Sequence, residues 1–81
     1  MNKIQVSIGV VGLGYVGLPL LLLLAKKYQV VGYDVDKNRI SELITGLDKN
    51  SEHSKKEILK NKIKFTTNYL DIKVCNVFII S

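Results

Sequence analysis

One stretch decides how this chain folds: Val10-Val11-Gly12-Leu13-Gly14-Tyr15-Val16-Gly17, which contains the pattern G-x-G-x-x-G. Gly12 allows a tight turn at the end of a strand, and Gly14 lets the backbone approach a phosphate where a Cβ would collide. Gly17 lets the next helix pack closely on the strand, and the N–H groups at the start of that helix then face an anion. The pattern therefore predicts a loop that binds a dinucleotide pyrophosphate. Its candidate cofactor-binding residues are Gly12, Leu13, Gly14, Tyr15, Val16 and Gly17.

The segments on both sides of the loop predict a strand–turn–helix unit. Gln5–Val11 is apolar and contains many β-branched residues, so we expect a strand that is covered on both faces. After the loop, an apolar run predicts a helix from near Tyr15 or Val16 to about Lys27. Pro19 fits this start, because a residue without an N–H is tolerated within the first turn. Its Leu20–Leu24 run is apolar on all sides, which predicts burial on more than one side.

The most specific inference from a single residue comes from Asp34, which ends a second expected strand at Gln29–Asp34. Asp34 lies about 20 residues beyond the first glycine, the spacing of the acidic residue in dinucleotide-binding folds. A carboxylate there can accept hydrogen bonds from both ribose hydroxyls of an adenosine, and its charge repels the 2′-phosphate of NADP. The alternative role, a helix N-cap, suits Asp36 better, because helical spacing begins at Lys37. Asp34 therefore predicts NAD as the cofactor.

The rest of the chain continues the alternation of helices and strands. The further elements that we expect are a helix from Lys37 closed by Gly46, a short helix from Lys55 to about Lys60, a strand at Ile63–Thr66, a single helical turn through Ile72 and a strand at Val74–Ile80. Ser54 and Glu57 have the spacing of a capping box, and Thr67 or Asn68 can cap the single turn. Right-handed crossovers then give an α/β fold with a parallel sheet in the strand order 3-2-1-4 and helices on both faces.

The formal net charge of +5 raises the question of a nucleic-acid partner. Five lysines lie between residues 55 and 64, but no aromatic residue alternates with them, and Glu52 and Glu57 dilute their charge. This composition favours a solvated helix face. We therefore expect no nucleic-acid partner.

The uncharged run Ile4–Ala25 is long enough for a membrane span or a signal peptide. It contains several glycines and Pro19, has no A-x-A-like cleavage site, and is closed at once by Lys26 and Lys27. Because it divides naturally into strand, turn and helix, we expect no membrane association.

The same residues resemble the amino-terminal start of the nucleotide-sugar 6-dehydrogenases, the UDP-glucose and UDP-N-acetylhexosamine dehydrogenases. The resemblance is carried by Gly-Leu-Gly-Tyr-Val-Gly-Leu-Pro at Gly12–Pro19 and by Val-Gly-Tyr-Asp-Val-Asp-x-x-Arg-Ile at Val31–Ile40, and it continues through Gly46-x-Asp48, Phe65–Asn68 and Asn76–Ile80. It implies that residues 1–81 form the amino-terminal, NAD-binding half of a Rossmann-like domain. The rest of such an enzyme is absent from this sequence.

The resemblance also implies an activity for the whole enzyme, in which NAD is used to oxidise C6 of a UDP-sugar twice. The UDP-N-acetylhexosamine branch, such as UDP-N-acetyl-D-mannosamine or -galactosamine dehydrogenase, is favoured over the UDP-glucose branch. It implies a cytoplasmic enzyme of polysaccharide precursor synthesis. In this family the cysteine nucleophile and its helpers lie downstream of the region covered, so no residue of this chain is assigned as catalytic and the piece alone is expected to be inactive. The alternative is a non-catalytic nucleotide-binding module.

Three further residues need an interpretation. In the resembled family an arginine at the place of Arg39 contacts the cofactor, whereas composition alone favours an exposed surface residue. Cys75 has no base nearby in the sequence, and we expect a small buried hydrophobic residue. His53 has no second histidine, cysteine or spaced carboxylate beside it, so we expect a solvated loop histidine and no metal site.

The last expected strand predicts self-association. Val77–Ile80 would be interior in a complete doubly wound sheet but lies at an edge here, where its unpaired N–H and C=O groups invite another chain to pair. The leucines of the first helix add uncovered apolar surface. We therefore expect a dimer or a larger assembly.

Overall fold

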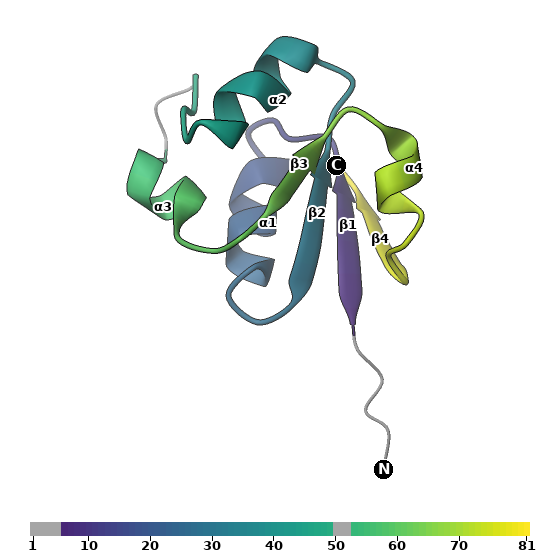
Figure 1. Cartoon of the computed structure of the whole chain (residues 1–81). Helices are drawn as coiled ribbons and strands as arrows, with labels where there is room; N and C mark the ends of the chain where they lie inside the picture. The colour runs from purple at the N-terminus through teal and green to yellow at the C-terminus, as the bar shows by residue number, and fades with distance from the viewer. Residues whose placement is uncertain (1–5, 50–52) are drawn as a thin grey trace.

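The computed structural model describes residues 6–49 and 53–81 (Figure 1). In chain order its elements are β1 (Ser7–Val11), α1 (Gly17–Leu24), β2 (Gln29–Tyr33), α2 (Lys37–Ile44), α3 (Lys55–Leu59), β3 (Lys64–Thr66), α4 (Tyr69–Ile72) and β4 (Val77–Ile80). The strands form one four-stranded sheet in the order β3-β2-β1-β4, and all pairings are parallel. The predicted α/β class and strand order are confirmed.

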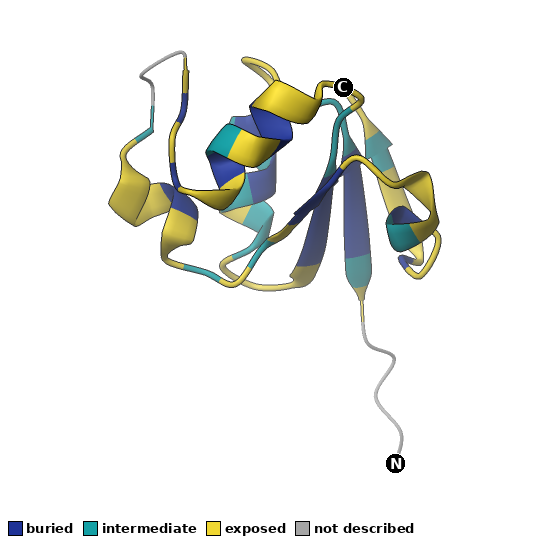
Figure 2. Cartoon of the chain, turned by 45° about the horizontal axis from the view of Figure 1, so that its top comes forward, coloured by how far each residue is buried: buried dark blue, intermediate teal, exposed yellow. Residues whose placement is uncertain are grey.

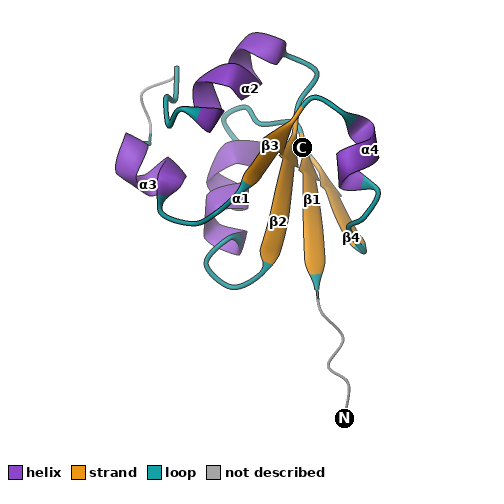
Figure 3. Cartoon of the chain, in the orientation of Figure 1, coloured by secondary structure: helices purple, strands orange, loops and turns teal. Residues whose placement is uncertain are grey.

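The sheet lies between two layers of helices of unequal size (Figures 1 and 3). α1, α2 and α3 lie on one face, and α4 lies on the other. The larger core is on the first face, where side chains of β1 and β2 pack against α1, α2 and α3. The buried residues of this core are Ile8, Val10, Leu13, Leu18, Leu21, Val30, Ile40, Leu43, Ile58 and Phe65. On the α4 face the buried cluster consists of Val31, Ile72 and Cys75.

β1 is one of the two interior strands, and its register brings the glycine-rich loop to the carboxyl edge of the sheet. Val11, its last residue, pairs with Tyr33 at the end of β2 and with Ile80 at the end of β4. Because all strands run in the same direction, their carboxyl ends meet at this edge. Figure 2 shows the strands of this central region dark blue, since their middle residues are buried by the helices of both layers.

The helix ends follow the predicted capping residues. The Asp36 carboxylate accepts the N–H groups of Asn38 and Arg39, which caps α2. Gly46 has a φ of +87°, a left-handed conformation that glycine tolerates, and its N–H donates to the Leu43 carbonyl. Gly46 therefore ends α2.

The two short helices are also capped as expected. Ser54 and Glu57 form the complete capping box of α3. Asn68, rather than Thr67, caps α4 by accepting the Leu70 N–H at 3.0 Å.

Several predicted boundaries were wrong by one to a few residues. α1 begins at Gly17 rather than at Tyr15 or Val16, and its last turn tightens after Leu24, whose carbonyl accepts the N–H groups of Lys27 and Tyr28. Smaller differences are that β2 ends at Tyr33 instead of Asp34, α3 ends at Leu59 instead of Lys60, and β3 begins at Lys64 instead of Ile63.

The largest boundary error concerns β4, which begins at Val77 instead of Val74. The residues before it form a turn, because the Cys75 N–H donates to the Ile72 carbonyl and the Asn76 side chain accepts the Ser7 N–H. β1 begins at Ser7, and the predicted start at Gln5 lies outside the described residues.

α1 is the most apolar helix, and only part of it is covered. Its buried residues are Gly17, Leu18 and Leu21, whereas Leu23 is 61% exposed. Within the described ranges, no helix combines the length and the apolar character that crossing a membrane requires.

Candidate functional site

The glycine-rich loop joins β1 to α1 in a tight turn at the carboxyl edge of the sheet. Gly12 has a φ of +97°, a conformation that side-chain-bearing residues rarely adopt, and its N–H donates to the Tyr33 carbonyl at 2.8 Å. A Cβ at Gly17 would collide with the carbonyl oxygen of Gly12. The roles predicted for these two glycines, a tight turn and close packing of the helix, agree with this geometry.

The loop presents backbone donors to an open groove. No acceptor within the described ranges lies in hydrogen-bonding position for the N–H groups of residues 14 to 17. A Cβ built at Gly14 would meet no atom within 4 Å, so the loop has open space on that side. The groove has a volume of about 240 Å³ and is lined by Gly12, Leu13, Gly14, Tyr15, Val16, Gly17, Asp34 and Ser81. Unpaired N–H groups at the start of an eight-residue helix make this groove suitable for an anion.

Asp34 lies in this groove, half-buried, directly after β2. Its Oδ2 accepts the Leu13 N–H at 2.9 Å, and its Oδ1 accepts the Asp36 N–H at 2.9 Å. Each carboxylate oxygen has a second lone pair, so Asp34 can accept further hydrogen bonds from a ligand. The two backbone contacts show that Asp34 also fixes the loop, a role that the sequence did not indicate.

Arg39 is buried, so the alternative of an exposed surface residue does not hold. Its Nε donates to the Leu13 carbonyl at 2.8 Å, and its Nη1 donates to Asp48 Oδ1 at 2.8 Å. A buried guanidinium needs a charged partner, and the Asp48 side chain, which is only 1% exposed, supplies it. Leu13 is therefore held at its N–H by Asp34 and at its carbonyl by Arg39.

The sequence reasoning missed two residues at or near the site. Ser81 lines the groove, and its hydroxyl donates to the Gly12 carbonyl at 2.7 Å. Its position directly after the last strand, beside the end of β1, could have indicated this, because neighbouring carboxyl ends meet in a parallel sheet. Asp48 supports Arg39 from the loop after α2. Both residues stand in the motifs that carry the family resemblance, but of a contact between them the only signal was their opposite charge.

The other two residues singled out from the sequence lie away from the groove. Cys75 is 5% exposed in the α4-face cluster, as expected, and the Ser7 hydroxyl donates to its Sγ at 3.6 Å. His53 is not a solvated loop residue, because its side chain is only 17% exposed and its Nδ1 lies 3.6 Å from Glu57 Oε2. The residues that the structure describes contain no cluster of three or more His, Cys, Asp or Glu able to hold a metal ion.

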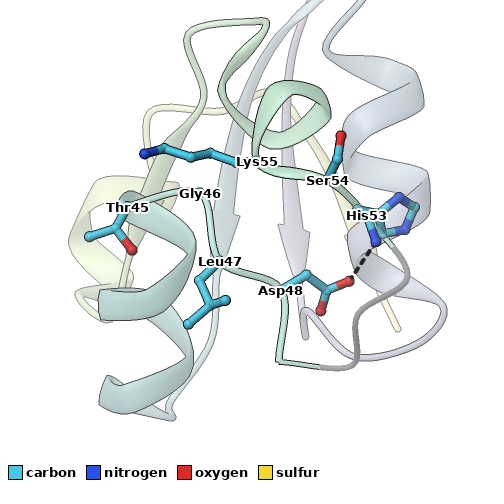
Figure 4. A pocket seen from close by; sticks show the side chains of 7 residues that line it. All are labelled: Thr45, Gly46, Leu47, Asp48, His53, Ser54 and Lys55. Carbon is cyan, nitrogen blue, oxygen red and sulfur yellow. Dashed lines mark hydrogen bonds between the residues drawn. The ribbon is translucent and has the colours of Figure 1, made fainter.

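A larger hollow lies between the end of α2 and the start of α3 (Figure 4). Its volume is about 630 Å³, and its lining residues are Thr45, Gly46, Leu47, Asp48, His53, Ser54 and Lys55. The backbone N–H of His53 donates to Asp48 Oδ2 across it. The capping box of α3 uses two N–H donors beside this hollow, since the Glu57 N–H donates to Ser54 Oγ and the Ser54 N–H donates to Glu57 Oε1. These two donors are therefore satisfied within the chain.

Comparison with known proteins identifies the family. The family model described as UDP-glucose/GDP-mannose dehydrogenase family, NAD binding domain, matches residues 6–81. A UDP-N-acetyl-D-glucosamine 6-dehydrogenase of Salmonella typhi is 47% identical over 95% of this chain, which spans 18% of that relative.

Two solved structures agree with this result. The UDP-D-ManNAc dehydrogenase of Pyrococcus horikoshii superimposes with a TM-score of 0.77 and 38% identity, over 93% of this chain and 19% of its own length. A UDP-glucose dehydrogenase of Pyrobaculum islandicum gives a TM-score of 0.77 at 25% identity, over 95% of this chain and 19% of its own. The predicted resemblance is confirmed: the chain belongs to the UDP-glucose/GDP-mannose dehydrogenase family and corresponds to its NAD-binding domain.

Proposed function

We propose that the groove beside the glycine-rich loop binds NAD. The pyrophosphate would lie against residues Gly12, Leu13, Gly14, Tyr15, Val16 and Gly17, with Asp34 on the adenosine ribose and Arg39 next to that end of the cofactor. The observation that carries this assignment is the set of N–H groups at residues 14 to 17, which have no acceptor within the described chain and lie beside the open space at Gly14. The positive end of the α1 dipole favours the same anion.

The ribose assignment predicts a preference for NAD over NADP. Asp34 retains acceptor capacity on both carboxylate oxygens, which suits the two hydroxyls of a ribose. A 2′-phosphate would bring two negative charges next to this carboxylate, and like charges at short distance repel. The Leu13 and Asp36 N–H groups hold the carboxylate in place before any cofactor arrives.

For the whole enzyme we propose the oxidation of C6 of a UDP-N-acetylhexosamine to the uronic acid, in the cytoplasm, as a step of polysaccharide precursor synthesis. Bound NAD would supply the hydride acceptor. The names and identities of the Salmonella and Pyrococcus relatives support this substrate class. The Pyrobaculum structure, a UDP-glucose dehydrogenase, supports the alternative substrate UDP-glucose.

We further propose that residues 1–81 are the amino-terminal half of the NAD-binding domain and that the substrate site and the catalytic residues belong to the rest of a longer enzyme. The chain spans only 18–19% of the relatives that it matches. Under this proposal the 81 residues bind NAD weakly and form no NADH. Steady NADH absorbance from the purified chain with NAD and a UDP-sugar would contradict it.

The direct test of the site is an NMR titration of the ¹⁵N-labelled chain with NAD. We expect the largest shift changes at the N–H signals of residues 12 to 17, with smaller changes at Asp34. Asp34→Ala should weaken NAD more than NADP, because it removes the ribose acceptor as well as a contact that holds the loop, whereas Asp71→Ala, a carboxylate outside the groove, should leave both unchanged. Shift changes confined to residues 45 to 55 would place the cofactor in the larger hollow and overturn the assignment.

A further inference from the structure

Leu13 is fixed from two sides, which constrains the peptide that follows it. Its carbonyl oxygen accepts Arg39 Nε at 2.8 Å, and its N–H donates to Asp34. The carbonyl of Leu13 and the N–H of Gly14 belong to one planar trans peptide, so the two groups point in opposite directions. By holding the carbonyl, Arg39 therefore directs the Gly14 N–H away from itself. That N–H is one of the unpaired donors of the groove.

Arg39 can do this only because Asp48 stabilises it. Asp48 is 4% exposed, and its Oδ1 accepts Arg39 Nη1 at 2.8 Å. Its other oxygen accepts the His53 N–H at 3.1 Å, which ties the carboxylate to the start of the α3 segment (Figure 4). Two buried charges in direct contact compensate each other, whereas one alone would be costly in this interior. Asp48 itself does not line the groove.

We propose that Asp48 is a positioning residue for the NAD site: it holds Arg39 against the Leu13 carbonyl and so orients the phosphate-binding loop. The inference rests on the proposed function, NAD binding at the groove. It has a second consequence, because in NADP-binding folds of this class an arginine near the end of the second strand accommodates the 2′-phosphate. Asp48 commits the Arg39 guanidinium to an internal ion pair and thus adds to the discrimination against NADP.

A purely structural role for Asp48 makes a different prediction. If the ion pair only stabilised the fold, its loss would lower the free energy of unfolding and would affect both cofactors equally. A positioning role requires a selective effect: NAD binds more weakly, and the affinity ratio of NAD to NADP falls. It also requires the Leu13 N–H to exchange faster with solvent in the cofactor-free chain, since its loop loses one of two attachments.

The test compares Asp48→Asn with the wild-type chain by NMR titration with NAD and, separately, with NADP. Asparagine keeps the shape and one acceptor for Arg39 but removes the charge. We expect NAD affinity to fall roughly tenfold, which corresponds to about 1.4 kcal/mol, near the upper end of the range for a single hydrogen bond. The affinity for NADP should fall less or rise.

Glu42→Gln is the matched control. It removes one negative charge from α2, and among the described residues the Glu42 side chain forms no ion pair. It should change neither affinity nor the exchange rate of Leu13. Arg39→Lys is the second test variant, because a lysine keeps the charge but cannot bond the Leu13 carbonyl and Asp48 with two separate nitrogens. It should reproduce the faster exchange even if Asp48→Asn fails to fold.

The outcomes separate this inference from the proposed function. If wild-type chain binds NAD and a folded Asp48→Asn variant shows the same affinity ratio and the same Leu13 exchange rate, the inference is overturned and the NAD site stands. If the wild-type chain binds no NAD, the proposed function fails. The exchange measurement then still decides whether Asp48 and Arg39 hold the loop.

Discussion

The two faces of the sheet differ in how completely this chain covers them. On the face under α1, α2 and α3, ten residues form a continuous buried core. On the α4 face the buried cluster has three residues, and Phe78 and Ile80 of β4 remain 52% and 81% exposed. α4 is a single turn that packs mainly against β2. The first face therefore has a well-packed core, whereas the α4 face leaves Phe78 and Ile80 as an exposed apolar strip along β4.

The difference predicts where a core substitution costs most. Leu21 is fully buried between α1 and the sheet. Leu21→Ala should lower the free energy of unfolding by about 2–5 kcal/mol, because it leaves a cavity in a packed core. Urea denaturation would measure the change. The matched control is Leu23→Ala on the same helix, where the side chain is 61% exposed and the change should stay within about 0.5 kcal/mol. Equal effects of the two substitutions would show that the α1 face is not the main core.

On the α4 face, Ile72→Ala should cost about 2 kcal/mol, near the lower limit for such a substitution. Ile72 is 7% exposed, but few buried neighbours surround it, so the site can relax more easily than the α1 face. The same denaturation experiment measures it. A loss as large as that of Leu21→Ala would mean that the two faces stabilise the fold equally.

The exposed strip on β4 predicts self-association, an expectation that came from the sequence. In a complete sheet of this class β4 would have a neighbour, and here its outer N–H and C=O groups and apolar side chains can pair with a second copy. Phe78→Lys should lower the association constant at least tenfold, because it places a charge in the pairing surface. Sedimentation velocity at several concentrations measures this. The same substitution at the exposed Tyr69 of α4 is the control and should leave association unchanged. A wild-type chain that remains monomeric at all concentrations would contradict the expectation.

The sequence predicted the fold almost completely, because its signals were local and agreed with one another. The glycine spacing defined the turn after β1, the β-branched pair defined β2, and Asp36 and Ser54 defined two helix starts, whereas the start of α4 was left open between Thr67 and Asn68. Right-handed crossovers then left one strand order. The boundary of β4 was wrong because it depends on a distant contact, the Asn76 side chain on the Ser7 N–H, which no local pattern shows.

The candidate site was predicted less completely. The loop and Asp34 follow from spacing, but the burial of Arg39 does not, because arginines in a first helical turn are usually exposed. Its burial depends on Asp48, nine residues further on, and on the closing of the loop after Gly46. His53 is half-buried because its backbone N–H donates to the same Asp48 carboxylate. The periodicity of helices and strands does not predict long-range polar contacts of this kind.

The smallest expected effect concerns two carboxylates, the exposed Glu57 at the start of α3 and the half-buried Asp71 of α4. The pKa of Glu57 is lowered, first because its carboxylate accepts the Ser54 backbone N–H. The side-chain hydrogen bond and the charge of His53 lower it further. The pKa of Asp71 is lowered, first by the hydrogen bond from the Thr66 hydroxyl. The side-chain hydrogen bond and the positive charge of Lys64 lower it further. A carboxylate whose folded pKa is lowered stabilises the fold fully above its ordinary pKa, and this contribution is lost as the pH falls through the folded value.

Stability should therefore begin to fall below the ordinary pKa values of 4.5 for Glu57 and 3.8 for Asp71. Glu57→Gln keeps the acceptor of the capping box but cannot titrate, so its free energy of unfolding should depend less steeply on pH in the acid range. Urea denaturation between about pH 6 and about pH 3 would compare the two chains, since this range includes the loss of proton-linked stability. Glu42→Gln, at a carboxylate outside the capping box, should retain the wild-type slope. If Glu57→Gln and the wild-type chain lose stability in parallel over this range, the Glu57 carboxylate of the capping box does not contribute to the acid sensitivity of the fold.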